Sequence, residues 1–162
     1  MIFIGIISDR NEYENVKKHI LEENSNIHIQ FFHITNKNIR NFQNIKFDAI
    51  VIMKELRTFI DKIEILVKMI KQVRYLICDS DISIDLSFDK SMYVTVITYG
   101  FNPKATVVVT SVTEEKLLID IQREIVLNNQ RILESGENVV NYKMPLKTNE
   151  NLVIFIISLI FL

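Results

Sequence analysis

Two carboxylates follow an apolar run in the middle of the chain. Asp79 and Asp81 stand one residue apart, directly after a β-like run from Arg74 to Cys78. Open α/β sheets bind ligands at the carboxyl ends of their strands, where carboxylates can hold a divalent cation or ribose hydroxyls. Asp is also common as a turn-capping residue where a strand ends. Both interpretations stay open, and Asp79 and Asp81 are candidate ligand-binding residues.

A second candidate group closes the next strand-like run. Tyr99 and Gly100 end that run, and Asn102 begins an Asn-Pro turn. The glycine is expected to supply a positive φ and the Asn-Pro pair to complete the turn, which is a structural role. The same residues would lie on one edge of the sheet with the two carboxylates and with Ser8, which follows the first strand. Tyr99, Gly100, Asn102 and Ser8 are therefore further candidates for ligand binding.

The sequence contains no motif for nucleotide phosphates or for nucleophilic catalysis. A P-loop has the pattern Gly-x-x-x-x-Gly-Lys-Ser/Thr, and the three glycines, Gly5, Gly100 and Gly136, do not fit it. The first helix is expected to begin with a capping box formed by Asp9 and Glu12, and a carboxylate there disfavours a phosphate. No serine or cysteine can be matched with a histidine as its base. We expect no catalytic residues and no cofactor.

The histidines and the single cysteine do not indicate a metal site. His28 and His33 lie on one expected strand at an odd separation, so their side chains point to opposite faces. His19 lies on an expected helix far from them in sequence. Cys78 is the only cysteine, which excludes a disulfide framework and fits a reduced, cytoplasmic compartment. We expect no bound metal and a buried Cys78 thiol.

Composition limits the partners. The chain has 162 residues, of which 48% are hydrophobic and 24% charged, and its net charge is −1. Such a charge does not recruit nucleic acid or an acidic membrane surface. The segment from Leu152 to Leu162 is almost entirely apolar, but a membrane-spanning helix needs about 20 such residues. We expect a buried terminal helix or, alternatively, an exposed helix that self-associates.

Apolar runs separated by amphipathic segments predict alternating strands and helices. The expected strands of the first part are Ile2–Ile7, Ile27–Phe32, Phe47–Met53, Arg74–Cys78 and Tyr93–Thr98. The clearest expected helix has apolar residues at helical spacing from Leu56 to Ile70. This rhythm is typical of a parallel sheet with right-handed crossovers.

After Gly100 the pattern changes to β-like runs with short separators. These runs are Ala105–Val112, Lys116–Arg123 and Glu137–Met144. We therefore expect an α/β fold, with a Rossmann-like, mostly parallel sheet flanked by helices over residues 1–100. An antiparallel β meander and the C-terminal apolar helix follow over residues 101–162, in a single domain of residues 1–162.

Three short motifs carry a resemblance to a known family. They are Cys78-Asp79-Ser80-Asp81, Ile97-Thr98-Tyr99-Gly100-Phe101 and Ala105-Thr106-Val107. Over residues 47 to 146 the chain resembles the distal half of the central domain of Mur ligases, the ATP-dependent amide ligases of peptidoglycan synthesis. More narrowly, it is similar to small Mur-ligase-like proteins of Firmicutes. The resemblance implies a nucleotide near the strand ends, but without the P-loop we do not expect ligase activity.

Two functions remain open. The first is a non-catalytic, Mur-ligase-like scaffold or interaction module that forms a homodimer through the meander or the C-terminal helix. The alternative is a weak binder of a nucleotide or nucleotide-sugar at the carboxyl edge of the sheet, around Asp79, Asp81 and Tyr99. We favour the first, because the sequence has no phosphate-binding loop and because its terminal segment is so apolar.

Overall fold

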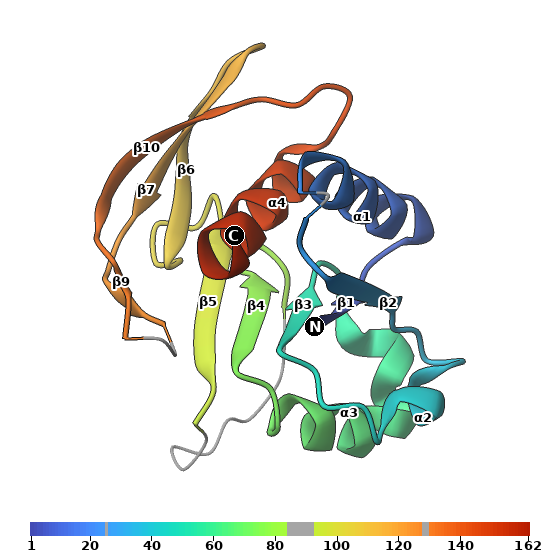
Figure 1. Ribbon diagram of the computed structural model, residues 1–162. Helices are drawn as coiled ribbons and strands as arrows, with labels where there is room; N and C mark the ends of the chain where they lie inside the picture. The colour runs from blue at the N-terminus through green and yellow to red at the C-terminus, as the bar shows by residue number, and fades with distance from the viewer. Residues whose placement is uncertain (25, 84–92, 128–129) are drawn as a thin grey trace.

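The computed structural model describes residues 1–24, 26–83, 93–127 and 130–162, and it has a mixed α/β fold built on an eight-stranded sheet (Figure 1). The strands of this sheet are β1 Ile2–Ile7, β2 Ile29–His33, β3 Ala49–Ile52, β4 Tyr75–Asp79, β5 Thr95–Gly100, β6 Val107–Val112, β7 Lys116–Ile121 and β10 Gly136–Asn141. They lie in the order β10-β7-β6-β5-β4-β3-β1-β2. Neighbours from β2 to β6 are parallel, whereas β7 and β10 are antiparallel to their neighbours. The predicted α/β fold class is confirmed.

The central strands form where the sequence has continuous apolar runs. All residues of β3 are buried, as are most of β1 and β4. Helices cover both faces of this parallel part, so that side chains on both faces must be apolar. The predicted strands of the parallel part agree with the observed ones to within about two residues at each end, which is the usual uncertainty of strand boundaries.

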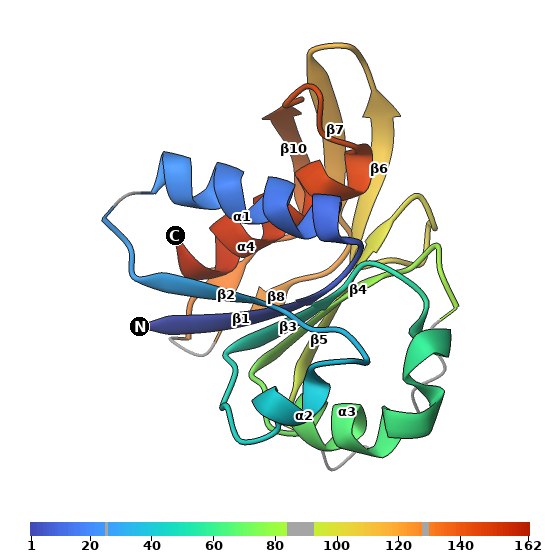
Figure 2. The same cartoon turned by 90° about the vertical axis from the view of Figure 1, so that its right-hand side faces the viewer.

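Helices form a layer on each face of the sheet. The helices α1 (Arg10–Glu23) and α4 (Thr148–Phe161) lie side by side on one face (Figures 1 and 2). The other face carries α2 (Ile39–Phe42), the 3-10 helix η1 (Leu56–Lys62) and α3 (Ile63–Ile70). The single helix predicted from Leu56 to Ile70 is therefore two elements, because its first part winds as a tighter 3-10 helix before the α-helix begins.

The strands β6, β7 and β10 form an antiparallel extension of the same sheet. β6 pairs with β5 only where Val107 and Val108 lie beside Tyr99 and Gly100, and it then continues past the end of β5. The extension therefore projects beyond the carboxyl edge of the parallel strands (Figure 2). The predicted meander is present, but it is interrupted by a small hairpin, β8 (Ile125–Val126) and β9 (Ile132–Leu133), that the sequence pattern did not predict.

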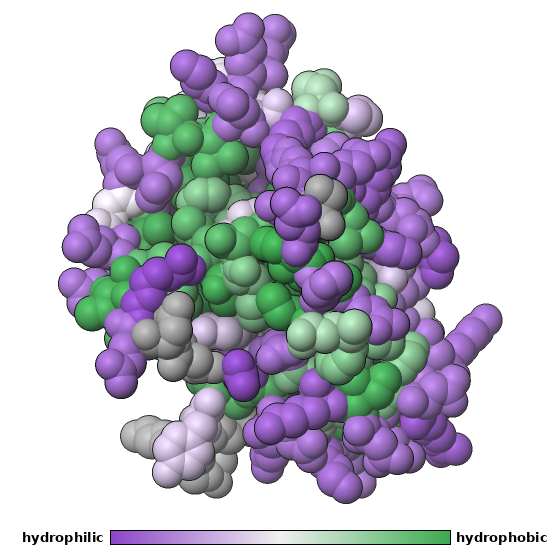
Figure 3. Space-filling model, viewed as in Figure 1, coloured by the Kyte–Doolittle hydropathy of each residue, from purple (hydrophilic) through white to green (hydrophobic). Residues whose placement is uncertain are grey.

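The terminal helix α4 is buried within the chain. Its side chains Leu152, Val153, Ile154, Ile156, Ile157 and Ile160 are all buried. In the view of Figure 3, hydrophobic residues gather around the C-terminal part of α4, where Phe155, Leu159 and Phe161 remain partly exposed. Among the described helices, none has both the length and the apolar character needed to cross a bilayer.

Truncating a buried side chain of α4 tests this packing. Ile157 is fully buried, so Ile157→Ala should lower the free energy of unfolding by about 2–4 kcal/mol, because it leaves a cavity in the core. Val126 is 60% exposed, and the matched change Val126→Ala should cost less than about 0.5 kcal/mol. Urea unfolding followed by circular dichroism measures both variants. Equal stability of Ile157→Ala and the parent protein would contradict the buried position of α4.

Candidate functional site

The six candidate residues lie at one edge of the sheet. Ser8 follows β1, Asp79 ends β4 and Asp81 follows it, and Tyr99, Gly100 and Asn102 lie at the end of β5. The parallel registers bring these strand ends together. Within the parallel part, the order β2-β1-β3-β4-β5 places the topological switch point between β1 and β3, where open α/β sheets bind their ligands.

The switch point is occupied by an ion pair between side chains of the chain itself. The ammonium group of Lys54, after β3, lies 3.1 Å from a carboxylate oxygen of Asp9, after β1. Ser8 is fully buried, and its hydroxyl donates to the carbonyl oxygen of Asp9 at 2.9 Å. The candidate Ser8 is thus at the predicted edge, but its side chain does not face solvent.

The N-terminus of α1 is also held by carboxylates. The predicted capping box is confirmed, and the Glu12 carboxylate accepts the N–H of Asp9 at 3.2 Å. The other oxygen of Glu12 lies 3.0 Å from the ammonium group of Lys147, at the start of α4. In phosphate-binding α/β domains, this helix end offers free N–H groups to the anion. Here the carboxylates of Asp9 and Glu12 take that place.

A second buried carboxylate joins α4 to α1. Glu150 is 1% exposed, and its oxygens accept the backbone N–H of Lys147 at 2.6 Å and the side-chain amide of Asn15 at 3.0 Å. The hydrogen bond to Glu12, followed by its charge, raises the pKa of Lys147. Lys147 and Glu150 are functional-site residues that were not predicted from the sequence. The available signal was an acidic residue in the first turn of each helix, but sequence spacing does not show that the two helix ends meet.

Asp81 fixes the turn that follows β5. Its carboxylate accepts the backbone N–H of Phe101 at 2.8 Å and of Asn102 at 3.0 Å. Gly100 has a φ of +144°, and a Cβ atom there would lie 2.4 Å from Oδ2 of Asp81. The predicted positive φ of Gly100 is therefore confirmed, and glycine is also needed because the carboxylate approaches so closely. The candidates Asp81, Gly100 and Asn102 form one hydrogen-bonded turn.

Asp79 and Ser80 complete this connection between β4 and β5. An oxygen of Asp79 accepts the N–H of Asp81 at 2.9 Å, in a local turn typical of Asp. The Ser80 hydroxyl donates to the carbonyl oxygen of Tyr99 at 2.8 Å. Burial raises the pKa of Asp79, the N–H of Asp81 partly offsets the rise, and the charges of Asp81 and Glu12 add to it.

Tyr99 lies in the core instead of at a surface. Its side chain is fully buried, and its hydroxyl has no hydrogen-bond partner within the described residues. Burial raises the pKa of Tyr99 well above its usual value, and the neighbouring charge of Asp79 adds to the rise. The phenol therefore stays protonated, and its ring supports the sheet beneath α4.

One surface pocket does adjoin the candidate residues. It has a volume of about 310 Å³ and lies at the carboxyl ends of β4 and β5. Its lining includes Asp79, Thr98, Asn102 and Lys104. Such a volume is at the lower end of the range for small-molecule sites. The described lining residues supply one ammonium group, one carboxylate and neutral polar groups, so the pocket can bind a small polar molecule. They include no nucleophile paired with a base.

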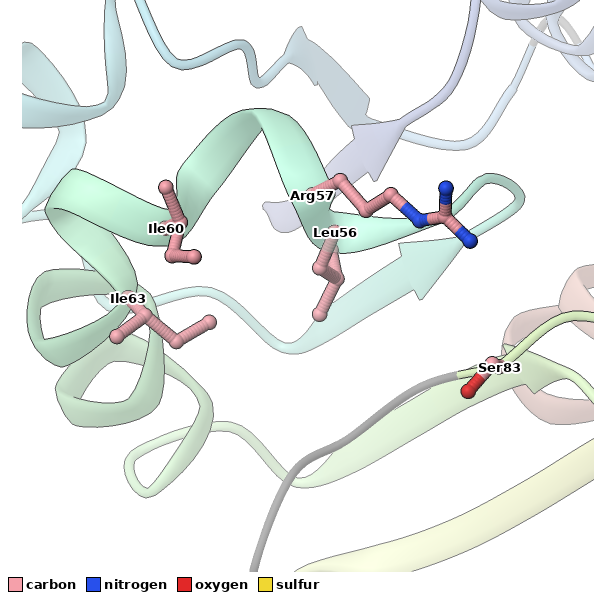
Figure 4. Close-up of a pocket in the computed structure, with 5 residues that line it drawn as sticks. All are labelled: Leu56, Arg57, Ile60, Ile63 and Ser83. Carbon is pink, nitrogen blue, oxygen red and sulfur yellow. The ribbon is translucent and has the colours of Figure 1, made fainter.

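A larger pocket lies away from these residues. It has a volume of about 450 Å³ and is lined by Leu56, Arg57, Ile60, Ile63 and Ser83 (Figure 4). The three aliphatic side chains come from η1 and α3, and Ser83 lies opposite them on the segment after β4. The guanidinium group of Arg57 is paired with Glu55 at 2.8 Å. Among the described residues, the lining of this pocket is mainly apolar and carries no acid–base group suited to catalysis.

The two carboxylates of the turn should respond oppositely to neutralisation. Asp79→Asn should raise the free energy of unfolding at pH 7, because the raised pKa of Asp79 means that its ionised form is disfavoured in the folded state. The gain in stability should be complete above the pKa of Asp79 in the folded protein. It should vanish as the pH falls to about 4, the ordinary pKa of Asp.

Asp81→Asn should instead lower the free energy of unfolding by about 1 kcal/mol, because charge-assisted hydrogen bonds to two N–H groups weaken. Urea unfolding at several pH values tests both, and a loss of stability in Asp79→Asn would contradict the first expectation.

Cys78 should be almost inert as a nucleophile. Burial, with a smaller contribution from the charge of Asp79, raises the pKa of its thiol to about 12, and the side chain is 5% exposed. Because the thiolate is the reactive form, alkylation at pH 8 should be slow in the folded protein and fast in urea. Mass spectrometry after a timed exposure to iodoacetamide measures this difference. Rapid labelling of the folded chain would contradict the buried position of Cys78.

Comparison of the sequence with known proteins does not assign the chain to a family. No model of a protein family matches the sequence, and no curated protein is significantly similar to it. The resemblance to the Mur ligases therefore stays a prediction made from the residues.

Proposed function

We propose that this protein is a non-catalytic module that keeps a ligase-like α/β core and works by binding another protein chain. The observation that carries this proposal is the occupied N-terminus of α1. Asp9 and Glu12 fill the position of a nucleotide phosphate, and each is paired with a lysine, Lys54 or Lys147. A phosphate there would meet two carboxylates at a helix end that is already capped.

The site of binding in this proposal is the antiparallel extension. The apolar side chains of α4 are largely used to hold the helix on the sheet, so we favour β6, β7 and β10 over the terminal helix as the contact region. The extension projects from the sheet and ends in the strand β10. Exposed sheet edges of this kind bind partner strands through main-chain hydrogen bonds.

A second candidate function follows from the 310 Å³ pocket beside Asp79. The pocket supports weak binding of a nucleotide or nucleotide-sugar, with Lys104 facing a phosphate and Asp79 or Asn102 facing hydroxyl groups. This arrangement needs no P-loop, because it relies on one ammonium group and on contacts to the base and ribose. Binding without helix N–H groups around the phosphate would be weak.

Thermal-shift titration separates the two candidates. ATP, ADP and UDP-sugars, each with and without Mg²⁺, should leave the melting temperature unchanged if the module does not bind nucleotides. A ligand at 100 times its dissociation constant would stabilise the fold by about 2.7 kcal/mol, which shifts the melting temperature by several degrees in a domain of this size. A saturable shift that is lost in Lys104→Ala would contradict the first proposal and support the second. Asn36→Ala is a control that should not alter any shift, because Asn36 follows β2, which is an outermost strand of the sheet and is separated from β4 by β1 and β3.

A further inference from the structure

The strand β10 leaves one edge of the sheet unpaired. The N–H of Tyr142 donates to the carbonyl oxygen of Glu115 at 2.7 Å, which identifies the residues whose backbone groups face β7. Because an antiparallel strand turns alternate residues to its two sides, the N–H and C=O groups of Glu137, Val139 and Asn141 point away from β7. Within the described part of the chain, none of these groups has a hydrogen-bond partner.

At the opposite edge of the sheet, more of the outward backbone groups have hydrogen-bond partners than at β10. At β2, the N–H of Ile29 donates to the carbonyl oxygen of Ile27 at 3.1 Å, and the hydroxyl of Tyr13 donates to the carbonyl oxygen of Phe31 at 3.1 Å. β10 pairs with β7 in a regular register and contains neither lysine nor proline. Bulges, lysines and prolines are common devices that keep an edge strand from pairing. Of the two outermost strands of the sheet, β10 is therefore the one that remains open to another strand.

We propose that β10 pairs antiparallel with β10 of a second copy of this chain, about a two-fold axis at Val139. The inference rests on the proposed function, because it names the partner of the same extension. In this register the outward backbone groups of Val139 bond to those of Val139 in the second copy. Those of Glu137 bond to those of Asn141, and the two sheets become one continuous sheet.

The side chains on the outer face match in this arrangement. Val139 lies beside Leu118 of β7, and the two are 62% and 40% exposed. Pairing about Val139 places these residues in one row, from Leu118 through both Val139 side chains to Leu118 of the second copy. Cross-strand apolar contacts of this kind stabilise a sheet. On the inner face, Tyr142 lies opposite Gly136 of the second copy, where the missing side chain leaves room for the ring.

The charges on the outer face are also complementary. Within one chain, Glu137 lies directly beside Asp120, and like charges in this position are destabilising. Lys116 lies beside Asn141 at the other end of the same strand pair. In the proposed dimer, the side chains that lie next to one another across the paired strands are Asp120 and Glu137 of one copy, followed by Asn141 and Lys116 of the second copy. The ammonium group of one copy therefore lies on the same row as the two carboxylates of the other.

Sedimentation velocity over about 1–200 µM protein tests the proposal, because this range detects dimers with dissociation free energies of about 5–8 kcal/mol. The mass should rise with concentration from 19.0 kDa towards twice that value. Val139→Pro should stay monomeric throughout, because it removes an outward N–H without removing a hydrogen bond to β7. Val139→Thr is the matched control and should still dimerise, because it keeps a β-branched residue and the N–H group.

A charge reversal gives a second test that does not depend on proline. Glu137→Lys should preserve or improve the stability of the single chain, because it replaces repulsion from Asp120 with attraction. It should nevertheless raise the dissociation constant of the dimer about tenfold, since the introduced ammonium group of each copy then repels Lys116 of the other copy. Adding Lys116→Glu to Glu137→Lys should restore dimerisation. The measurements should be made in about 50 mM salt, where exposed charges are less screened.

The outcomes separate this inference from the proposed function. A parent protein that is monomeric over the whole range would overturn the dimer, while the nucleotide titration would be unaffected. A dimer that persists in Val139→Pro and is not weakened in Glu137→Lys would overturn the assignment to β10. Loss of the dimer in Val139→Pro and a weaker dimer in Glu137→Lys, with retention in Val139→Thr and rescue by Lys116→Glu, would support it.

Discussion

The hydrogen bonds accepted by the carboxylate of Asp81 constrain how the parallel and antiparallel parts of the sheet are joined. By accepting the N–H groups of Phe101 and Asn102, the carboxylate fixes the turn in which the chain leaves β5 and starts β6. The approach is so close that only glycine fits at position 100. Since β6 pairs with β5 at only two positions, this turn largely determines how the antiparallel extension is oriented on the parallel sheet. This strand-end carboxylate and the apolar packing of β6 and β7 with α4 together hold the extension in place.

Much of the fold could be predicted because the information is local. The apolar run Ile2–Ile7 specifies a strand covered on both faces, and the structure has β1 at those residues. The strand-helix rhythm likewise predicts parallel pairing. The hairpin β8–β9 was missed because each of its strands has only two residues, too few for a periodic pattern. The 3-10 winding of η1 was missed because apolar spacing does not distinguish the two helix types over a few residues.

The sequence predicted where the candidate residues lie, but not which hydrogen bonds they make. Strand ends on one edge must meet, so Asp79, Asp81 and Tyr99 could be grouped from the sequence alone. Their local use could not be predicted in the same way, because a carboxylate that binds a ligand and one that accepts backbone N–H groups have the same sequence signal. The pairing of Glu12 with Lys147 depends on how α1 and α4 lie together, and residues so far apart in sequence give no periodic signal.

Exposed backbone groups without a hydrogen-bond partner indicate where a protein can still bind. In the described part of this chain, those of β10 lie away from the usual binding position of an α/β domain. The N–H groups at the start of a helix normally attract an anion, but capping by the chain's own carboxylates satisfies them and stabilises the helix by about 0.5–2 kcal/mol. The carboxylates of Asp9 and Glu12 are then neutralised by Lys54, which follows β3, and by Lys147, which precedes α4. Each such contact increases stability and removes a binding group, in line with the general conflict between the two. The free backbone groups of β10 therefore have the greater capacity for new hydrogen bonds, which is why the proposed recognition site lies at the end of the sheet, on a strand that also carries exposed Val139.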